Sequence, residues 1–381
     1  MVKRLVAVLA IMSSTLLVSL APSVYAAPSH SVHTTSPHTM SNVTTTPTGT
    51  ATATPATATP PHDSTKGTAG TPATIGVAFP IGNETSSGKP AVTYCNGHTY
   101  IAWAGTDSQH HLYIGWDPKQ DGSGFTGKRQ INDFLYSNSG PAITCFTDPS
   151  SGALVPFVAF SGTNTHIYVG WFDGTSTNLH NHADVGDRSY ESPALLNYSL
   201  NLWLAFTGTN SYLYVECSFD GYAWPLAGNG CYRNQISWKA SNGPALARYC
   251  GPDGLNLYLG WVDNTSSHNL HVGYYQFSSS LGRKADLPDR SHMNGDASLA
   301  TSPYCSGTTG TLYFSYAGVN SDLNVAKSSN GLSWSTYTNR AWTFTFGLAD
   351  VDINGHLWLV WANQPNNSPS TWFLWEAQYT P

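Results

Sequence analysis

Two acidic residues near the end of the chain, Asp350 and Asp352, lie two positions apart. Side chains at this spacing share one face of a β-strand, and two neighbouring carboxyl groups can divide the acid and base roles of a hydrolase. Arg248 lies in a segment of similar pattern and could neutralise them. The two carboxyl groups would equally suit a hydrated channel lining or a bound cation. The three residues are therefore candidate catalytic groups, with those alternatives open.

A second set of polar residues follows short apolar segments and could bind a ligand. Amide, hydroxyl and imidazole groups beside aromatic rings suit sugars, which present rows of hydroxyls and apolar ring faces. The candidate ligand-binding residues are Asp107, His111, Asn164, His166, Asn210, Tyr212, His268 and Asn320. Asp and Asn are also frequent in turns for backbone reasons alone, so a structural role stays open for each such position.

Other site chemistries have no matching pattern in the sequence. No CxxC or HxxxH spacing indicates a metal site, and no phosphate-binding loop stands out. The net charge of -6 provides no basic surface for a phosphate backbone. We therefore expect no cofactor, no metal and no nucleic-acid partner.

The candidate residues recur with a repeat of about fifty residues. Aligned on itself, the chain shows six starts at intervals of 51 or 52 residues: Pro90-Ala91-Val92, Pro141-Ala142-Ile143, Pro193-Ala194-Leu195, Pro244-Ala245-Leu246, Asp296-Ala297-Ser298 and Leu348-Ala349-Asp350. Each start is followed by an alternating apolar segment that ends in an aromatic residue, as in Ile101-Ala102-Trp103. A polar turn then leads to a third segment, such as Leu112-Tyr113-Ile114 or Phe373-Leu374-Trp375. Period-two alternation of this kind predicts β-strands.

This repeat predicts an all-β fold, a six-bladed β-propeller with four-stranded antiparallel blades. Only 10% of the residues are charged and 13% are aromatic, which favours pleated strands over amphipathic helices. Each repeat supplies three strands and room for a fourth, which is one propeller blade. The last repeat is short, and Ile75-Gly76-Val77-Ala78-Phe79 has no repeat of its own. We expect this N-terminal strand to complete the last blade and close the ring.

Two turns carry a recognisable residue set. They contain Ser218, Asp220, Gly221 and Trp224 in one repeat, and Ser328, Asn330, Gly331 and Trp334 in another. These turns resemble the Asp-box, or BNR repeat, of the sialidase-like propeller superfamily. The resemblance implies a structural turn away from the ligand site, in which Asp or Asn caps backbone amides and Gly adopts a conformation closed to other residues.

Catalysis by sialidases in that superfamily uses three arginines, the first in an Arg-Ile-Pro motif, with a Tyr nucleophile and an Asp acid/base. No Arg-Ile-Pro occurs in this chain, and none of the seven arginines after the leader begins a first strand. We therefore expect a propeller of this superfamily without the sialidase catalytic set.

The N-terminus has the pattern of a secretory signal peptide. Lys3 and Arg4 precede an apolar run, and Val24-Tyr25-Ala26 resembles a cleavage site. We expect a signal peptide over 1–26, with an uncleaved anchor as the alternative. Residues 27–74 are rich in Ser, Thr and Pro, which predicts a disordered tether. The propeller then spans 75–381, with repeat starts near 90, 141, 193, 244, 296 and 348.

Six cysteines follow the tether, so disulfides are expected in an exported chain. Cys217 and Cys231 bracket a segment that reads as a hairpin and form the best local pair. Pairing between neighbouring repeats, Cys95 with Cys145 and Cys250 with Cys305, is a further possibility.

These observations favour a secreted, monomeric module that binds a glycan or another polar extracellular ligand, with no membrane partner after signal cleavage. An enzyme is not favoured. The first alternative is a glycoside hydrolase with non-classical machinery, and the second is a structural or protein-binding propeller.

Overall fold

The described part of the chain is built from β-strands without helices. The computed structural model describes residues 74–76, 78–132, 136–224, 231–251, 254–277, 280–287, 295–302, 310–318, 323–335, 338–340, 344–353, 356–363 and 372–380. All described residues belong to one compact unit, Thr68–Pro381. The predicted signal peptide, and the tether up to residue 73, lie outside them. No helix able to span a membrane occurs among the described residues.

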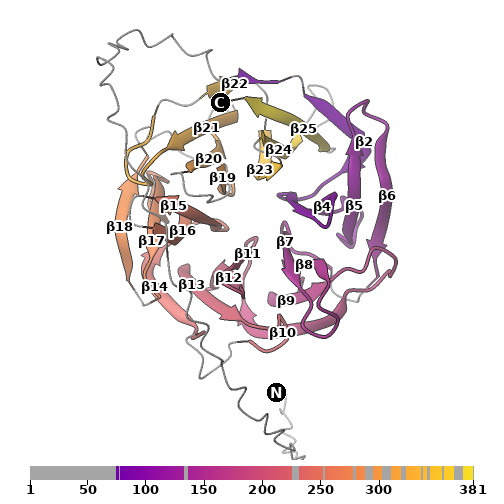
Figure 1. The fold of residues 1–381 in the computed structure, drawn as a ribbon, viewed down its shortest axis with the longest axis horizontal. Helices are drawn as coiled ribbons and strands as arrows, with labels where there is room; N and C mark the ends of the chain where they lie inside the picture. Colours follow the sequence, from indigo (N-terminus) through magenta and orange to yellow (C-terminus); the bar gives the residue numbers. More distant parts are fainter. Residues whose placement is uncertain are drawn as a thin grey trace, which may run out of the picture. The chain divides into compact units, whose positions relative to one another are not determined.

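Six antiparallel sheets stand around a central axis, which confirms the predicted six-bladed propeller (Figure 1). Blade 1 contains β3 (Ala91–Cys95), β4 (His98–Ala104), β5 (Leu112–Lys119) and β6 (Gly124–Ile131). Blade 2 contains β7 (Ala142–Thr147), β8 (Leu154–Ser161), β9 (His166–Trp171) and β10 (His180–Arg188). Blade 3 contains β11 (Ala194–Tyr198), β12 (Asn201–Thr207), β13 (Tyr212–Ser218) and β14 (Asn234–Lys239).

The remaining blades follow the same order, with the first strand of each repeat facing the axis (Figure 1). Blade 4 contains β15 (Ala245–Gly251), β16 (Gly254–Val262), β17 (Leu270–Tyr275) and β18 (Leu281–Asp286). Blade 5 contains β19 (Ser298–Ser302), β20 (Thr311–Ala317), β21 (Leu323–Ser328) and β22 (Thr338–Arg340). Blade 6 contains β23 (Phe344–Ile353), β24 (His356–Asn363) and β25 (Phe373–Thr380).

The N-terminal segment completes blade 6, as the sequence predicts. Two short strands, β1 (Thr74–Ile75) and β2 (Phe79–Thr85), both pair with β25. The closing segment is interrupted and extends further than Phe79, because the register shifts after Pro80, which has no N–H to donate to a ladder. Ile75 and Ile81 are fully buried, so the seam between the two ends of the chain is part of the core.

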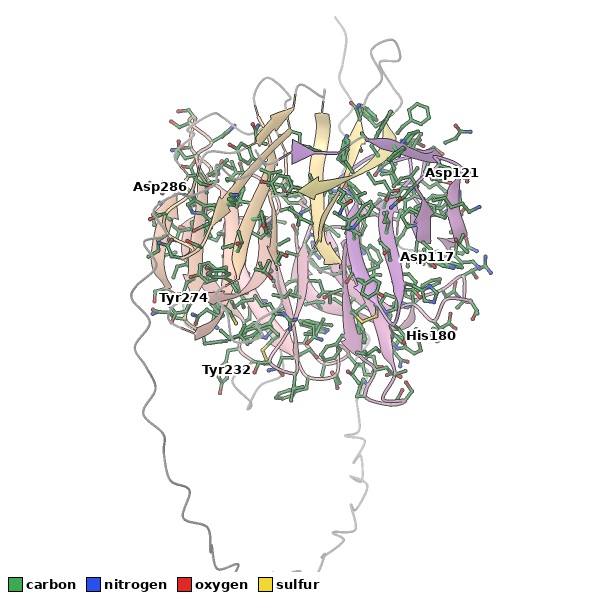
Figure 2. All side chains as sticks on the ribbon, turned by 45° about the horizontal axis from the view of Figure 1, so that its top comes forward. Asp117, Asp121, His180, Tyr232, Tyr274 and Asp286 are labelled. Atoms are coloured by element: carbon green, nitrogen blue, oxygen red, sulfur yellow. A yellow bond between two sulfur atoms is a disulfide. The ribbon has the colours of Figure 1, made fainter. Side chains whose placement is uncertain are left out.

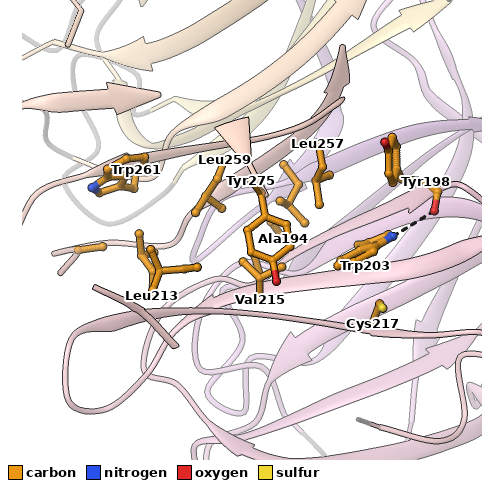
Figure 3. Packing of buried hydrophobic residues seen from close by; sticks show 14 of the residues in the cluster. Ala194, Tyr198, Trp203, Leu213, Val215, Cys217, Leu257, Leu259, Trp261 and Tyr275 are labelled. Carbon is orange, nitrogen blue, oxygen red and sulfur yellow. Dashed lines mark hydrogen bonds between the residues drawn. The ribbon is translucent and has the colours of Figure 1, made fainter. Parts of the chain in front are cut away.

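Apolar and aromatic side chains fill the spaces between neighbouring blades. Between blades 3 and 4, Val215 and Leu257 pack with Trp203, Trp261 and Tyr275 in one buried cluster (Figure 3). The Trp203 indole also donates a hydrogen bond to the Tyr198 carbonyl at 3.0 Å. The blades are therefore held together mainly by apolar burial between sheets, as a four-stranded sheet with two apolar faces requires.

Strand register corrects the sequence alignment of two repeats by one residue. Ala91 of blade 1 pairs with Ala102, and the matching pair in blade 5 is Ser298 with Ser315. The fifth repeat therefore starts at Ala297 and not at Asp296. In the third strand of blade 6, the aligned triplet is Leu374-Trp375-Glu376 and not Phe373-Leu374-Trp375. Connections of unequal length separate these strands, so side-chain type alone did not identify the equivalent positions.

Both turns that resemble an Asp-box are held by their own side chains. The Ser218 hydroxyl accepts the Gly221 N–H at 2.9 Å, and Asp220 Oδ1 accepts the N–H of Tyr222 at 2.8 Å. In the second turn the Ser328 hydroxyl accepts the Gly331 N–H at 2.9 Å. These hydrogen bonds are those expected of a turn cap.

A Gly221→Ala substitution should destabilise the propeller by roughly 2 kcal/mol in its free energy of unfolding. Gly221 has φ +74°, and an added Cβ would lie 2.3 Å from the Phe157 ring of blade 2. Gly174 is the matched control, because its φ is +85° but nothing lies within 4 Å of an added Cβ. Chemical denaturation should show a clearly smaller loss for Gly174→Ala; equal losses would mean that the contact with Phe157 is unimportant.

Two predicted disulfides are present. Cys95–Cys145 joins the first strands of blades 1 and 2, and Cys217–Cys231 closes the connection between β13 and β14. Cys250 is also disulfide-bonded. Its predicted partner, Cys305, lies outside the described residues.

Candidate functional site

The ring has two faces with different turns. The turns between second and third strands share one face with the connections that enter each blade, since Ser137 bridges Gly162 and Ala240 bridges Asp263. We name this the connection face. The turns between first and second strands, and between third and fourth strands, lie at the other ends of the strands, on what we name the hairpin face. The predicted ligand-binding residues that the structure describes, which are all of the set except Asn320, lie on the connection face.

Several of these predicted residues hold their own turns. Asp107 Oδ1 lies 2.7 Å from His111 Nδ1 and accepts the Gln109 N–H at 3.1 Å. Asn164 Nδ2 donates to the Tyr168 hydroxyl at 2.8 Å. Hydrogen bonds of this kind stabilise tight turns, so the structural explanation accounts for Asp107 and Asn164 without a ligand.

The other predicted residues of the connection face contact charged or aromatic neighbours. His166 Nδ1 lies 2.8 Å from Asp184 Oδ2, and Lys239 Nζ lies 4.9 Å above the Tyr212 ring. Three positions remain: Asn210, which donates to the Tyr214 hydroxyl at 2.8 Å, His268, which has φ 45°, and Asn320, which lies outside the described residues. A ligand-binding role for this set stays a prediction.

The cavity that the described residues border in the central channel is small. It is bordered by the first strands of five blades and has a volume of about 80 Å³, well below the roughly 300–1,000 Å³ of ligand pockets. At the connection-face entrance, a Cβ on Gly140 would lie 2.1 Å from the Lys89 carbonyl oxygen. Lys89 Nζ donates to the Ala297 carbonyl of blade 5 at 2.7 Å.

The candidate catalytic residues lie on the first strands of two blades. Asp350 and Asp352 are on β23, where they pair with Leu359 and Leu357. Arg248 is half-buried on β15. The side chains of Asp350 and Asp352 lie outside the described part of the structure, so convergence of the three groups stays a prediction.

A larger pocket lies between blade 6 and blade 1, where sequence reasoning did not place a site. Its volume is about 190 Å³. Trp358 and Glu376 border it from blade 6, and Thr99, Asp117 and Gln120 border it from blade 1. Most of these residues come from the ends of β4, β5 and β24 that meet the hairpin face. Asp117 and Asp121 are both on blade 1, at the same side of the ring (Figure 2).

Glu376 is the distinctive residue of this pocket. Its side chain is 3% exposed. Burial raises the pKa of the Glu376 carboxyl to about 7. The equivalent positions in the other five blades, identified by register, are aliphatic: Ile114, Val169, Val215, Val272 and Val325. Packing alone would therefore favour valine at this position.

Asp117 supplies a second carboxyl group at the blade 1 side. Its Oδ2 lies 2.6 Å from His98 Nδ1, and its Oδ1 accepts the Thr99 N–H at 3.1 Å. These contacts hold Asp117 in place at the end of β5. With the Trp358 indole and the aliphatic side chains of Val92 and Val360, the pocket combines apolar walls and a few fixed polar groups, as small-ligand sites commonly do.

The register error explains why Glu376 was missed. When Phe373-Leu374-Trp375 is aligned to Leu112-Tyr113-Ile114, Trp375 takes the position of Ile114. Blade 6 then has an apolar residue there, as the other blades do. With the observed register, Glu376 stands there. A repeat alignment shifted by one residue would have marked Glu376 as the exception.

A second buried carboxyl group departs from the repeat at Glu216 of blade 3. The matching positions are Gly115, Gly170, Gly273, Ala326 and Ala377. Glu216 is fully buried and neither of its carboxyl oxygens has a hydrogen-bond partner. Burial and the nearby charge of Asp187 raise the pKa of Glu216 to about 8, although Arg233 acts in the opposite direction. Arg233 pairs instead with Asp187, at 2.5 Å.

Comparison with protein-family models and with characterised proteins finds no match to this chain. Solved structures match it through their folds. A protein of unknown function from Dyadobacter fermentans has 10% identity and a TM-score of 0.56, covering 81% of this chain and 98% of that one. AofleA from Arthrobotrys oligospora has 10% identity and a TM-score of 0.53, covering 80% and 86%.

A fungal lectin, that of Aleuria aurantia, is also similar, with 10% identity and a TM-score of 0.50 over 78% of this chain and 96% of the lectin. It is described as a six-bladed β-propeller with a novel mode of fucose recognition. At such low identity the likeness extends to the fold alone. These neighbours support a six-bladed propeller, and they do not include a sialidase.

Proposed function

We propose that this protein is an exported carbohydrate-binding propeller whose sugar site is the pocket between blades 6 and 1. The observation that carries the proposal is Glu376, a buried carboxyl group at a position that is aliphatic in the other five blades. It borders a pocket that also presents the Trp358 indole. A carboxylate that accepts hydroxyl hydrogen bonds beside an aromatic ring is a suitable arrangement for a sugar.

The chemistry of the pocket favours a neutral sugar. Asp117 and Glu376 are both acidic, and the described residues that border the pocket include no Lys, Arg or His. An acidic sugar would bring a further negative charge next to these groups without a cation to compensate it. The volume of about 190 Å³ also lies below the range of drug-sized ligand pockets, so the pocket would hold no more than one monosaccharide residue. The fucose-binding lectin supports the proposal only in that a propeller of this architecture can bind a sugar.

Export and superfamily membership belong to the same proposal. The apolar run after Lys3 and Arg4 supports a cleaved leader, and the two disulfides are compatible with an oxidising compartment. The turns at 218–224 and 328–334 support a sialidase-like origin without the sialidase catalytic set.

Glu376→Val should abolish or weaken glycan binding at least tenfold while leaving the fold intact, because valine occupies this position in four other blades and isoleucine in the fifth. Trp358→Ala should have a similar effect, since it removes the indole that borders the pocket. A glycan array followed by titration calorimetry with the best neutral sugar would measure both.

The matched control for these variants is His166→Ala. His166 is a predicted ligand-binding residue on the connection face of blade 2, whereas Glu376 belongs to blade 6. We expect it to bind sugar as the parent does. Loss of binding in His166→Ala with normal binding in Glu376→Val would move the site to the connection face and overturn the pocket proposal.

Glycoside hydrolysis remains the second candidate function because of Asp350. By register, Asp350 occupies the position of Val92, Ile143, Leu195, Leu246 and Leu299 in the other blades. Release of a chromophore from aryl glycosides that is lost in Asp350→Asn and Asp352→Asn would establish an enzyme. If the protein shows neither sugar binding nor turnover, a structural or protein-binding propeller is the remaining candidate.

A further inference from the structure

Exposed apolar side chains gather on the hairpin face of the ring. Among the described residues, nine large apolar side chains are exposed. Seven of them lie at strand ends or turns of the hairpin face, and the two others are Tyr190 and Trp238. Concentrated apolar exposure of this kind marks a surface that contacts another partner.

Three of these side chains occupy neighbouring turns of blades 3 and 4, and we name them the apolar tips. Leu200, in the turn between β11 and β12, is 88% exposed. Leu255, at the start of β16, is 45% exposed, and Phe277, between β17 and β18, is 52% exposed. Leu200 is the most exposed large apolar residue of the described chain.

The apolar tips rest on a buried aromatic base. The Tyr198 hydroxyl donates to the Leu255 carbonyl at 3.0 Å. The Phe277 ring lies 6.4 Å from the Tyr198 ring and 5.3 Å from the Trp203 ring, measured between centroids. Tyr198 and Trp203 adjoin each other at one end of the cluster between the two blades (Figure 3). The tips therefore project from a firm support.

Backbone conformation shows that the fold itself does not favour apolar residues at two of these tips. Leu200 has φ 64° and Phe277 has φ 56°, in the left-handed region that favours Gly, Asn and Asp. The other eight described non-glycine residues with positive φ are not large apolar residues. The corresponding turn of blade 1 uses Asn96-Gly97, the usual pair for such a hairpin. Leu200 and Phe277 thus combine backbone strain with solvent exposure.

Charge and shape identify the partner surface. Tyr198-Ser199-Leu200-Asn201 is uncharged, and no charged residue lies between Tyr275 and Leu281, whereas Asp253 precedes Leu255 by two positions in the sequence. The tips stand on three separate turns. Separate apolar side chains, two of them on uncharged turns, match a fluid apolar layer, into which each can enter alone, better than the fixed surface of a folded protein.

We propose that the apolar tips insert into the interfacial layer of an uncharged lipid bilayer, so that the hairpin face of blades 3 and 4 lies on a membrane surface. This departs from the expectation of no membrane partner that composition and the leader suggest. The proposal does not depend on sugar binding in the pocket between blades 6 and 1.

Phosphatidylcholine vesicles provide the direct test. On adding them to the full chain, we expect hydrogen exchange to slow at least threefold in peptides that contain Leu200 and Phe277. Protection at these two turns cannot come from the N-terminal leader, which is distant in sequence. The double variant Leu200→Asn/Phe277→Asn should lose this protection and bind vesicles at least tenfold more weakly. It should unfold at the same temperature as the parent or higher, because Asn tolerates the left-handed conformation.

Tyr190→Asn is the matched control, since Tyr190 is 58% exposed but lies on the connection face. We expect it to retain the vesicle-dependent protection. Protection that is absent, that persists in the double variant, or that requires phosphatidylserine would overturn the proposal. Protection that rises with protein concentration without vesicles would also overturn it, because it would show contact between two copies of the chain.

Discussion

Replacing Glu216 with Gln should make the propeller more stable at pH 8 by on the order of 4 kcal/mol and leave it nearly unchanged at pH 4. The folded protein holds the pKa of Glu216 at about 8, against 4.5 for the ordinary carboxyl group. As the pH rises from 4.5 to 8, the unfolded chain releases this proton while the folded chain retains it. The free energy of unfolding therefore falls as the pH rises. The Gln amide resembles the protonated carboxyl group and does not ionise, so the variant does not show this fall.

The measurement is the free energy of unfolding in urea at pH 4 and pH 8 for the parent and for Glu216→Gln. Part of the pH dependence should remain in the variant, because burial also raises the pKa values of Glu191 and Glu376 to about 7. Glu84→Gln is a suitable control, since the Glu84–Lys128 pair is a surface ion pair, worth less than about 1 kcal/mol. An unchanged pH dependence in Glu216→Gln would show that Glu216 ionises freely in the folded state.

Deleting residues 75–79 should open blade 6 and cost on the order of 5 kcal/mol of stability. The deletion removes the fully buried Ile75 side chain, worth roughly 2 kcal/mol by burial alone. It also removes the pairing of Ile75 with Tyr379 and of Phe79 with Glu376. An outer edge of β25 would then be exposed without a partner.

Hydrogen exchange along β25 would report the opening directly, with fast exchange in the deleted chain and slow exchange in the parent. Blades 2 to 4 do not adjoin blade 6 in the ring and should stay protected in both (Figure 1). Leu154→Asp serves as a control, because Leu154 is 49% exposed at the start of β8. A deleted chain that melts like the parent would mean that β1 is dispensable for ring closure.

The architecture was predictable from the sequence because its signals are local and repeated. Alternating apolar residues that end in Trp103, Phe160 or Phe206 identify second strands, and their regular spacing defines the number of blades. The last repeat lacks one strand, and the strand at Ile75 belongs to no repeat of its own. Together they predict that the N-terminal strand completes the last blade and closes the ring.

The candidate pocket was not predictable from the same signals, because it depends on register. A one-residue shift moves every side chain to the other face of a strand, and it put Trp375 in the place of Glu376. The connection face attracted the prediction because its turns are polar. The structure shows Asp107 and Asn164 engaged in their own turns, a backbone requirement that composition cannot separate from ligand binding.

The apolar tips were also invisible in the sequence. Leu200 stands beside Asn201 and Leu202 in what looks like a continuing strand. Only the left-handed conformation at Ser199 and Leu200 turns the chain there and leaves Leu200 in solvent. Leucine rarely adopts that conformation, so no propensity rule places a turn at this residue.

Ring closure by β1 and β2 also determines when the pocket between blades 6 and 1 can form during folding. Blades 1 to 5 are complete without the last strands, whereas β25 pairs with residues that precede it by about 300 positions. Such a distant pairing is slow and has to wait for the end of the chain. Glu376 and Trp358 meet Asp117 only at this junction. A ligand in the pocket would therefore stabilise the closed ring, which is the product of the last folding step. Its binding would distinguish closed rings from open ones.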